Sequence, residues 1–109
     1  MKISELAEKT GLRAINTYQD REVENVYISD MVSDIITAAK ANSILVTLQT
    51  HKSLIAAANL VGVAMIVIVK GRTPPDDVVD LATKTGIGLF TSDLDTWGLA
   101  RKLTRLGLD

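Results

Sequence analysis

The most constraining feature of the sequence is an aliphatic stretch in the middle of the chain, residues 54–69. It is slightly shorter than the about 20 apolar residues that a membrane-spanning helix needs, and it contains Asn59 and Gly62. Its first half is rich in Leu, Ile and Ala, which favour a helix, whereas residues 63–69 are mostly β-branched and favour a buried strand. Because glycine commonly ends helices, the stretch predicts a helix, a turn at Gly62 and a buried strand.

The rest of the chain alternates between strand-like and helix-like patterns. Strands are predicted at residues 12–16, 23–28, 44–48, 63–69 and 87–90, and helices at 4–9, 31–39, 54–61 and 75–85. A last helix, capped by Thr91, Ser92 or Asp93, should run to about Leu106. This order predicts an α/β fold with a mostly parallel sheet covered by helices. With 109 residues, the chain should form one domain, 1–109.

Composition and missing motifs exclude several classes of protein. The chain has no Cys, so disulfides and thiolate chemistry are absent. Its net charge of −1 gives no basic field for a nucleic-acid backbone. It has no Gly-rich phosphate loop and no nucleophile elbow. These absences disfavour a dinucleotide enzyme and a P-loop ATPase. We expect a cytoplasmic protein that binds neither nucleic acid nor membrane, carries no cofactor and is not an enzyme.

A candidate ligand site is predicted where the parallel strands end, because α/β proteins bind ligands at the carboxyl edge of the sheet. Basic residues and helix starts gather at these positions, which favours a phosphorylated ligand. The predicted ligand-binding residues are Asp30, Thr50, His51, Lys52, Lys70 and Arg72. The alternative is that the polar residues are ordinary helix caps and the basic ones are solvated loop charges.

Neither a catalytic residue nor a metal site is predicted. His51 is the only histidine, and no nucleophile or carboxylate can be assigned to it from spacing. Carboxylates are the only other metal ligands available, and Asp76, Asp77 and Asp80 fit a helix start better than a metal site.

The helix at 54–61 has almost no polar face, so it should be buried on more than one side. Two explanations are open. The sheet and neighbouring helices of the same chain could cover it, or a second subunit could do so. We expect a homodimer in which Leu54, Ala57, Ala58 and Val61 form the contact.

Several short segments, in order along nearly the whole chain, resemble the DRTGG domain family. Asp20-Arg21 precedes a strand, as at the start of that domain, and the segment 29–34 resembles the family's next segment. The run 47–51 and the helix start Asp95-Thr96-Trp97 are also similar. The chain departs from the family where Thr-Gly-Gly is expected, because Val69-Lys70-Gly71 stands there.

The resemblance implies a fold like the amino-terminal domain of HPr kinase/phosphorylase. It also implies an accessory role, since such domains accompany regulatory and enzymatic domains and are associated with dimer formation. The first hypothesis is thus a non-catalytic regulatory module that dimerises and binds a small anionic ligand such as an adenine nucleotide or a phosphorylated metabolite. The alternative is a protein-interaction or scaffold domain with no small-molecule ligand.

Overall fold

The apolar segment after Gly62 forms the centre of a five-stranded sheet in the computed structural model, which describes residues 1–108. The strands are β1 (Arg13–Ala14), β2 (Asn25–Ile28), β3 (Ser43–Thr47), β4 (Met65–Ile68) and β5 (Gly88–Thr91). The helices are α1 (Ile3–Thr10), α2 (Val32–Ala38), α3 (Lys52–Val61), α4 (Asp76–Thr85) and α5 (Thr96–Arg105).

The strand order across the sheet is β1-β5-β4-β3-β2. Strands β2 to β5 are parallel, and the two-residue β1 pairs antiparallel with β5 at one edge. The predicted α/β fold with a mostly parallel sheet is confirmed.

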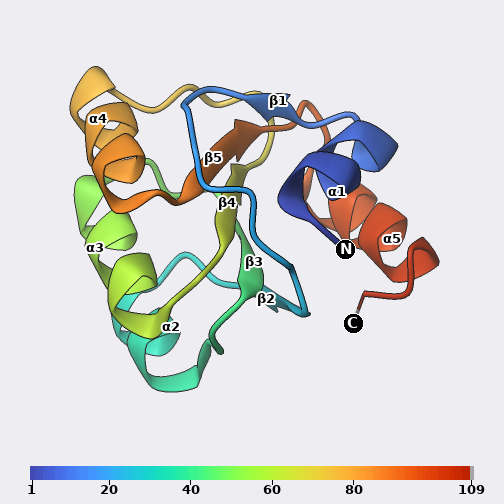
Figure 1. Cartoon of the computed structure of the whole chain (residues 1–109), viewed down its shortest axis with the longest axis horizontal. Coiled ribbons are helices and arrows are strands. Elements are labelled where there is room, and N and C mark those ends of the chain that lie inside the picture. The colour runs from blue at the N-terminus through green and yellow to red at the C-terminus, as the bar shows by residue number, and fades with distance from the viewer. Residues whose placement is uncertain (109) are drawn as a thin grey trace.

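Helices cover both faces of this sheet. Each parallel strand lies beside the one before it, and α2, α3 and α4, which connect them, all lie on one face (Figure 1). Helices α1 and α5 cover the other face, where the N-terminus and Leu108 also lie. The sheet is therefore a buried middle layer, which explains why β3, β4 and β5 are buried along their whole length.

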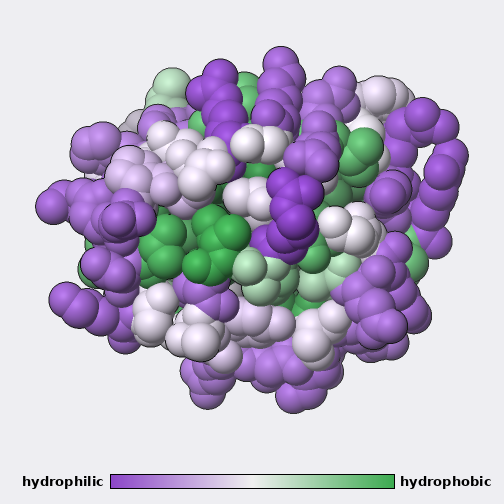
Figure 2. Space-filling model, turned by 90° about the horizontal axis from the view of Figure 1, so that it is seen from above, coloured by the Kyte–Doolittle hydropathy of each residue, from purple (hydrophilic) through white to green (hydrophobic). Residues whose placement is uncertain are grey.

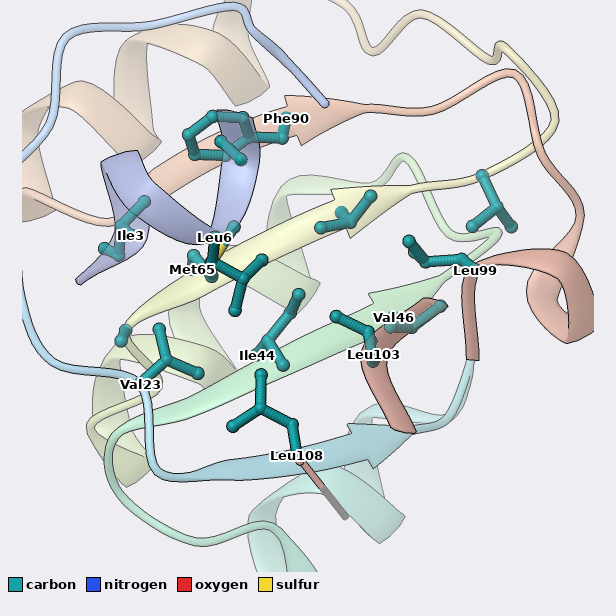
Figure 3. Packing of buried hydrophobic residues seen from close by; sticks show 14 residues of the cluster. Ile3, Leu6, Val23, Ile44, Val46, Met65, Phe90, Leu99, Leu103 and Leu108 are labelled. Carbon is teal, nitrogen blue, oxygen red and sulfur yellow. The ribbon is translucent and has the colours of Figure 1, made fainter. Parts of the chain in front are cut away.

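Alternate residues of the central strands enter two separate cores. Ile44 and Val46 of β3 and Val67 of β4 pack with Leu99 and Leu103 of α5 (Figure 3). Their neighbours Leu45, Ile66 and Ile68 pack instead against α2, α3 and α4. This period of two is the expected geometry of a strand between two layers.

The predicted dimer contact on α3 is wrong for three of its four residues. Leu54 is 1% exposed, Ala57 3% and Ala58 0%, so all three belong to the core of their own chain. Helix α3 lies between α2 and α4 over the sheet, and these neighbours supply the cover that a second subunit was invoked to provide. Val61 is half-buried, and Leu60 is the exposed large apolar residue of the helix, at 72%.

The predicted start of the last helix also differs from the structure. Helix α5 begins at Thr96, where the Asp95 carboxylate accepts a hydrogen bond from the Gly98 amide at 2.7 Å. Thr91 belongs to β5, and the buried Ser92 hydroxyl accepts from the Leu94 amide, which makes a turn rather than a cap. The start that the Asp95-Thr96-Trp97 resemblance implied is therefore correct, and the cap at 91–93 is wrong.

Asp20 and Arg21 are structural residues that join distant parts of the chain. The Asp20 carboxylate accepts from the amide and the hydroxyl of Ser4, at 3.0 and 2.6 Å, and so holds the start of α1. The Arg21 guanidinium donates to the Asn42 side chain at 2.7 Å and to the Gly62 carbonyl at 3.2 Å. It thereby fixes the end of α3 against the start of β3.

Within residues 1–108, no helix combines the length and apolar character needed to cross a lipid bilayer.

The burial of α3 generates a stability prediction. Leu54→Ala should lower the free energy of unfolding by about 2–5 kcal/mol, because it leaves a cavity in the core. Leu60→Ala should change it by less than about 0.5 kcal/mol, because Leu60 is exposed. Urea denaturation followed by circular dichroism compares the two. Equal effects would contradict the packing of α3 inside its own chain.

Candidate functional site

The six predicted ligand-binding residues lie on three successive loops at the carboxyl edge of the sheet. Asp30 follows β2, Lys70 and Arg72 follow β4, and the other three lie between β3 and the first residue of α3. Adjacent strands are about 4.8 Å apart, so the ends of β3 and β4 are direct neighbours. Figure 2 shows the face toward which β4 and β5 point in Figure 1, where hydrophilic side chains surround pale and hydrophobic ones nearer the centre.

Asp30 connects the first two of these loops. Its Oδ1 accepts from the Thr47 hydroxyl at 2.9 Å and from the Leu48 amide at 2.7 Å. The Gln49 side-chain amide donates to the Asp30 carbonyl at 3.2 Å. The carboxylate therefore fixes the end of β2 to the end of β3, which leaves it less available to a ligand than its exposure suggests.

His51 is the N-cap of α3. Its Nδ1 accepts from the Ser53 amide at 3.2 Å and lies 2.9 Å from the Ser53 hydroxyl. Thr50 before it is half-buried, and Lys52 after it is exposed. The imidazole thus satisfies a backbone donor that the first turn of a helix leaves free. Of its two ring nitrogens, Nε2 is the one that this cap does not use.

The loop after β4 contains two consecutive residues in the left-handed conformation. Lys70 has a φ of 61° and Gly71 a φ of 65°. Their amides donate across to the next loop, from Lys70 to the Leu94 carbonyl at 2.8 Å and from Gly71 to the Ser92 carbonyl at 2.7 Å. A positive φ is ordinary for glycine but strained for lysine. These hydrogen bonds hold the strained turn in place.

Near this turn, two successive connections lead to helices on opposite faces of the sheet. The loop after β4 leads to α4 on one face, and the loop after β5 leads to α5 on the other (Figure 1). After β2 and β3 both connections turn to the same face. The carboxyl ends of β4 and β5 are therefore the one topological switch point among the parallel strands of residues 1–108. Ligands of open α/β sheets bind at such points.

The basic residues around this edge are not neutralised inside the chain. Lys52, Lys70 and Arg72 form no ion pair within the part of the chain that the structure describes. The neighbouring Asp93 is different, because its carboxylate accepts two hydrogen bonds from the Arg13 guanidinium, both at 3.0 Å. These hydrogen bonds and the positive charge hold the pKa of Asp93 below its ordinary value.

A hollow of about 560 Å³ lies between the start of α3 and the side of α4. It contains His51 and Lys52, but none of the other four predicted residues. Helix α4 contributes Asp77, Asp80 and Lys84, which the sequence analysis did not assign to the site. Their spacing of three and four residues places them on one helix face, and that spacing was the available indication.

The described residues include no group of three or more His, Asp or Glu side chains placed to hold a metal ion. The hollow beside α4 has lining residues of both charges, whereas the edge at Lys70 and Arg72 has unpaired positive charge and donors. The latter arrangement suits an anionic ligand better than a metal.

Comparison with known proteins identifies the family. The family model for the DRTGG domain matches residues 5–106. The chain belongs to the DRTGG domain family. Among the curated proteins, no relative matches it. In this DRTGG domain, Lys70 and Gly71 form the strained turn after β4.

A solved structure has the same fold. It is the crystal structure of the CBS and DRTGG domains of the regulatory region of Clostridium perfringens pyrophosphatase, complexed with the activator diadenosine tetraphosphate. The TM-score is 0.73 at 16% sequence identity, over 93% of this chain. The present DRTGG domain spans 45% of that chain.

The Arg13–Asp93 pair gives a pH prediction. Because the folded pKa of Asp93 is lowered, the pair contributes stability above the ordinary aspartate pKa of 3.8 and loses it as the pH falls through the lowered value. Arg13→Ala should therefore be less stable than the parent at neutral pH, and the difference should shrink below about pH 4. Denaturation at several pH values measures this. A difference that does not depend on pH would mean that the pair stabilises the chain by packing alone.

Proposed function

We propose that this DRTGG domain is a non-catalytic regulatory module that binds a small phosphorylated ligand, such as an adenine nucleotide, at the carboxyl ends of β3 and β4, on one side of the switch point between β4 and β5. Lys52, Lys70 and Arg72 would bind the phosphates. Thr50 and His51 would line the site from the start of α3, and Asp30 would hold the loops in position.

The left-handed Lys70 is the observation that carries this proposal. Glycine fits such a φ without strain, yet an exposed lysine stands there, at the switch point and beside Arg72. Strained residues of this kind cluster at functional sites, where the surrounding structure holds them against their own preference. A cation presented by a rigid turn suits recognition of a phosphate, because its position is fixed before the ligand binds.

The structural neighbour supports the ligand class. Its regulatory region holds diadenosine tetraphosphate as an activator, and this molecule joins two adenosines through a polyphosphate. A ligand of that type would bring several negative charges to the unpaired cations at the edge of this sheet. The proposed regulatory role, in which the domain changes the activity of a partner protein, rests on the same analogy. The neighbour belongs to the regulatory region of an enzyme.

A regulatory role is favoured over catalysis by the use of His51. It is the only histidine of the chain, and its Nδ1 caps α3. No carboxylate within residues 1–108 forms a hydrogen bond with it. The ring therefore lacks the orienting partner that a catalytic histidine usually has.

Pairing with a second copy stays a prediction of the sequence. Such a contact would use a surface other than Leu54, Ala57 and Ala58, which the chain itself buries.

Lys70→Gly separates ligand binding from folding. The free energy of unfolding should rise by about 0.5–1 kcal/mol, because glycine relieves the strain of the left-handed turn. The rise in melting temperature caused by millimolar ATP or diadenosine tetraphosphate should shrink at the same time. Differential scanning fluorimetry with these two ligands, adenosine and pyrophosphate measures both effects.

Lys102→Ala is the matched control, because it removes one exposed positive charge from the far end of α5. Its ligand-induced shift should equal that of the parent protein. The proposal is abandoned if no phosphorylated compound raises the melting temperature at millimolar concentration. It is also abandoned if Lys70→Gly and Lys102→Ala reduce the shift equally, since that would indicate nonspecific attraction.

A further inference from the structure

The outer edge of the sheet at β2 is open. Within residues 1–108, β2 pairs with β3 only, so its other side has no strand beside it. The Ser29 amide donates to the Val46 carbonyl at 3.2 Å, toward β3. In a parallel ladder, alternate residues point their backbone groups to the same side. The N–H and C=O groups of Val26 and Ile28 therefore point away from β3 and toward the open side.

This edge lacks the usual protection against pairing with another strand. Natural edges are often protected by charged residues, proline or bulges. The sequence of β2 is Asn-Val-Tyr-Ile, with neither charge nor proline, and Ile28 is 48% exposed. The opposite edge differs, since β1 has two residues and one of them is the exposed, ion-paired Arg13.

Two hollows flank β2, one on each face of the sheet, and both are lined by Val26 and Tyr27. The hollow on the α5 face is about 270 Å³ and almost wholly apolar. It is lined by Ile28 of β2, Ala100, Leu103 and Thr104 of α5, and Leu108. The hollow on the α2 face is about 190 Å³, and Asn25, Ala38, Lys40 and Ser43 line the rest of it. Lys40 forms no ion pair within the described residues.

We propose that β2 is a docking edge for an extended segment of a partner protein, which adds a strand to the sheet and places alternating apolar and acidic side chains in the two hollows. Strand addition uses main-chain hydrogen bonds for affinity and pockets for alternate side chains for specificity. Because successive side chains of a strand point to opposite faces, an added strand would direct one set toward the apolar hollow and the other toward Lys40.

The charges near this edge disfavour the antiparallel pairing with a second copy of the chain that is centred on Tyr27. An antiparallel copy of β2 centred on Tyr27 would place Glu24 of one chain opposite Asp30 of the other. Like charges directly opposite each other in a sheet are destabilising. The β2 strand of a second copy, Asn25–Ile28, also contains no acidic residue that could pair with Lys40. An acidic and apolar strand from another protein avoids both problems.

The probe is a capped peptide of about seven residues in which leucine or valine alternates with glutamate. Titration into ¹⁵N-labelled full chain should shift the amide resonances of Val26 and Ile28 and slow their hydrogen exchange. A peptide of the same composition with the two residue types in separate blocks should have at least about fivefold lower affinity, because it cannot place one type on each face. N-methylation of the alternating peptide, at the amides that would pair with β2, should abolish its binding.

Two charge reversals test the role of Lys40. Lys40→Glu should lower the affinity for the glutamate peptide by about two- to fivefold. It should raise the affinity for a peptide in which lysine replaces each glutamate. Lys84→Glu on α4 makes the same change in net charge away from β2 and should leave both affinities unchanged.

The proposal is overturned if the alternating peptide does not protect the Val26 and Ile28 amides, or if the block peptide binds equally well. It is also overturned if those amides become protected without peptide as the protein concentration rises, since a second copy would then occupy the edge. Equal effects of Lys40→Glu and Lys84→Glu would refute the assignment of the acidic side chains.

Discussion

Burial of β3 and β4 on both faces is the constraint on which the rest of this structure depends. Ile44, Leu45, Ile66 and Val67 are fully buried, although they point alternately to the two sides of the sheet. Such strands are stable only if both faces are covered, because each exposed aliphatic side chain would cost about 1.5–3 kcal/mol. Helices α2, α3 and α4 cover one face, and α1 and α5 cover the other.

Covering both faces with a short chain produces the candidate site. Three consecutive connections place their helices on the same face, so the other face must be covered by the two terminal helices. Helix α5 reaches it by turning away from α4 directly after β5. The divergence of these two loops places Lys70 and Gly71 against Ser92 and Leu94. The position of the strained turn is thus a consequence of how the core is covered.

The sequence predicted what periodicity and glycine placement control. The helix, turn and strand around Gly62 were predicted from residue types alone, and Gly62 has a left-handed φ of 89°, which is common where a helix ends at glycine. Prediction from the sequence failed where the structure depends on contacts between residues that are far apart in the chain. The first helix was predicted to begin at Ser4, but the Ser4 hydroxyl donates to Asp20, a residue sixteen positions away. The apolar helix α3 led to the prediction of a covering second subunit. The sequence does not show that α2 and α4 lie on either side of this helix.

In the candidate site, too, some features could be predicted from local sequence and others depend on distant contacts. Because strand ends follow from the strands, the loops that hold Asp30, His51 and Lys70 could be located without a structure. The left-handed φ of Lys70 could not, because it depends on hydrogen bonds to a loop more than twenty residues later. The hollow beside α4 was missed for a related reason. Asp77 and Asp80 suit the start of an isolated helix, and only packing against α3 places them beside His51.

The Asp30 carboxylate connects the proposed ligand site to the proposed docking edge. Strand β2 ends at Ile28, and Asp30 then binds Thr47 and Leu48 at the end of β3. A displacement of β2 toward an added strand would therefore act on the loop that leads to His51 and Lys52. Two sites influence each other when both bias the same structural element. This short hydrogen-bonded connection is a physical route by which a ligand at the strand ends and a partner at the sheet edge would sense one another.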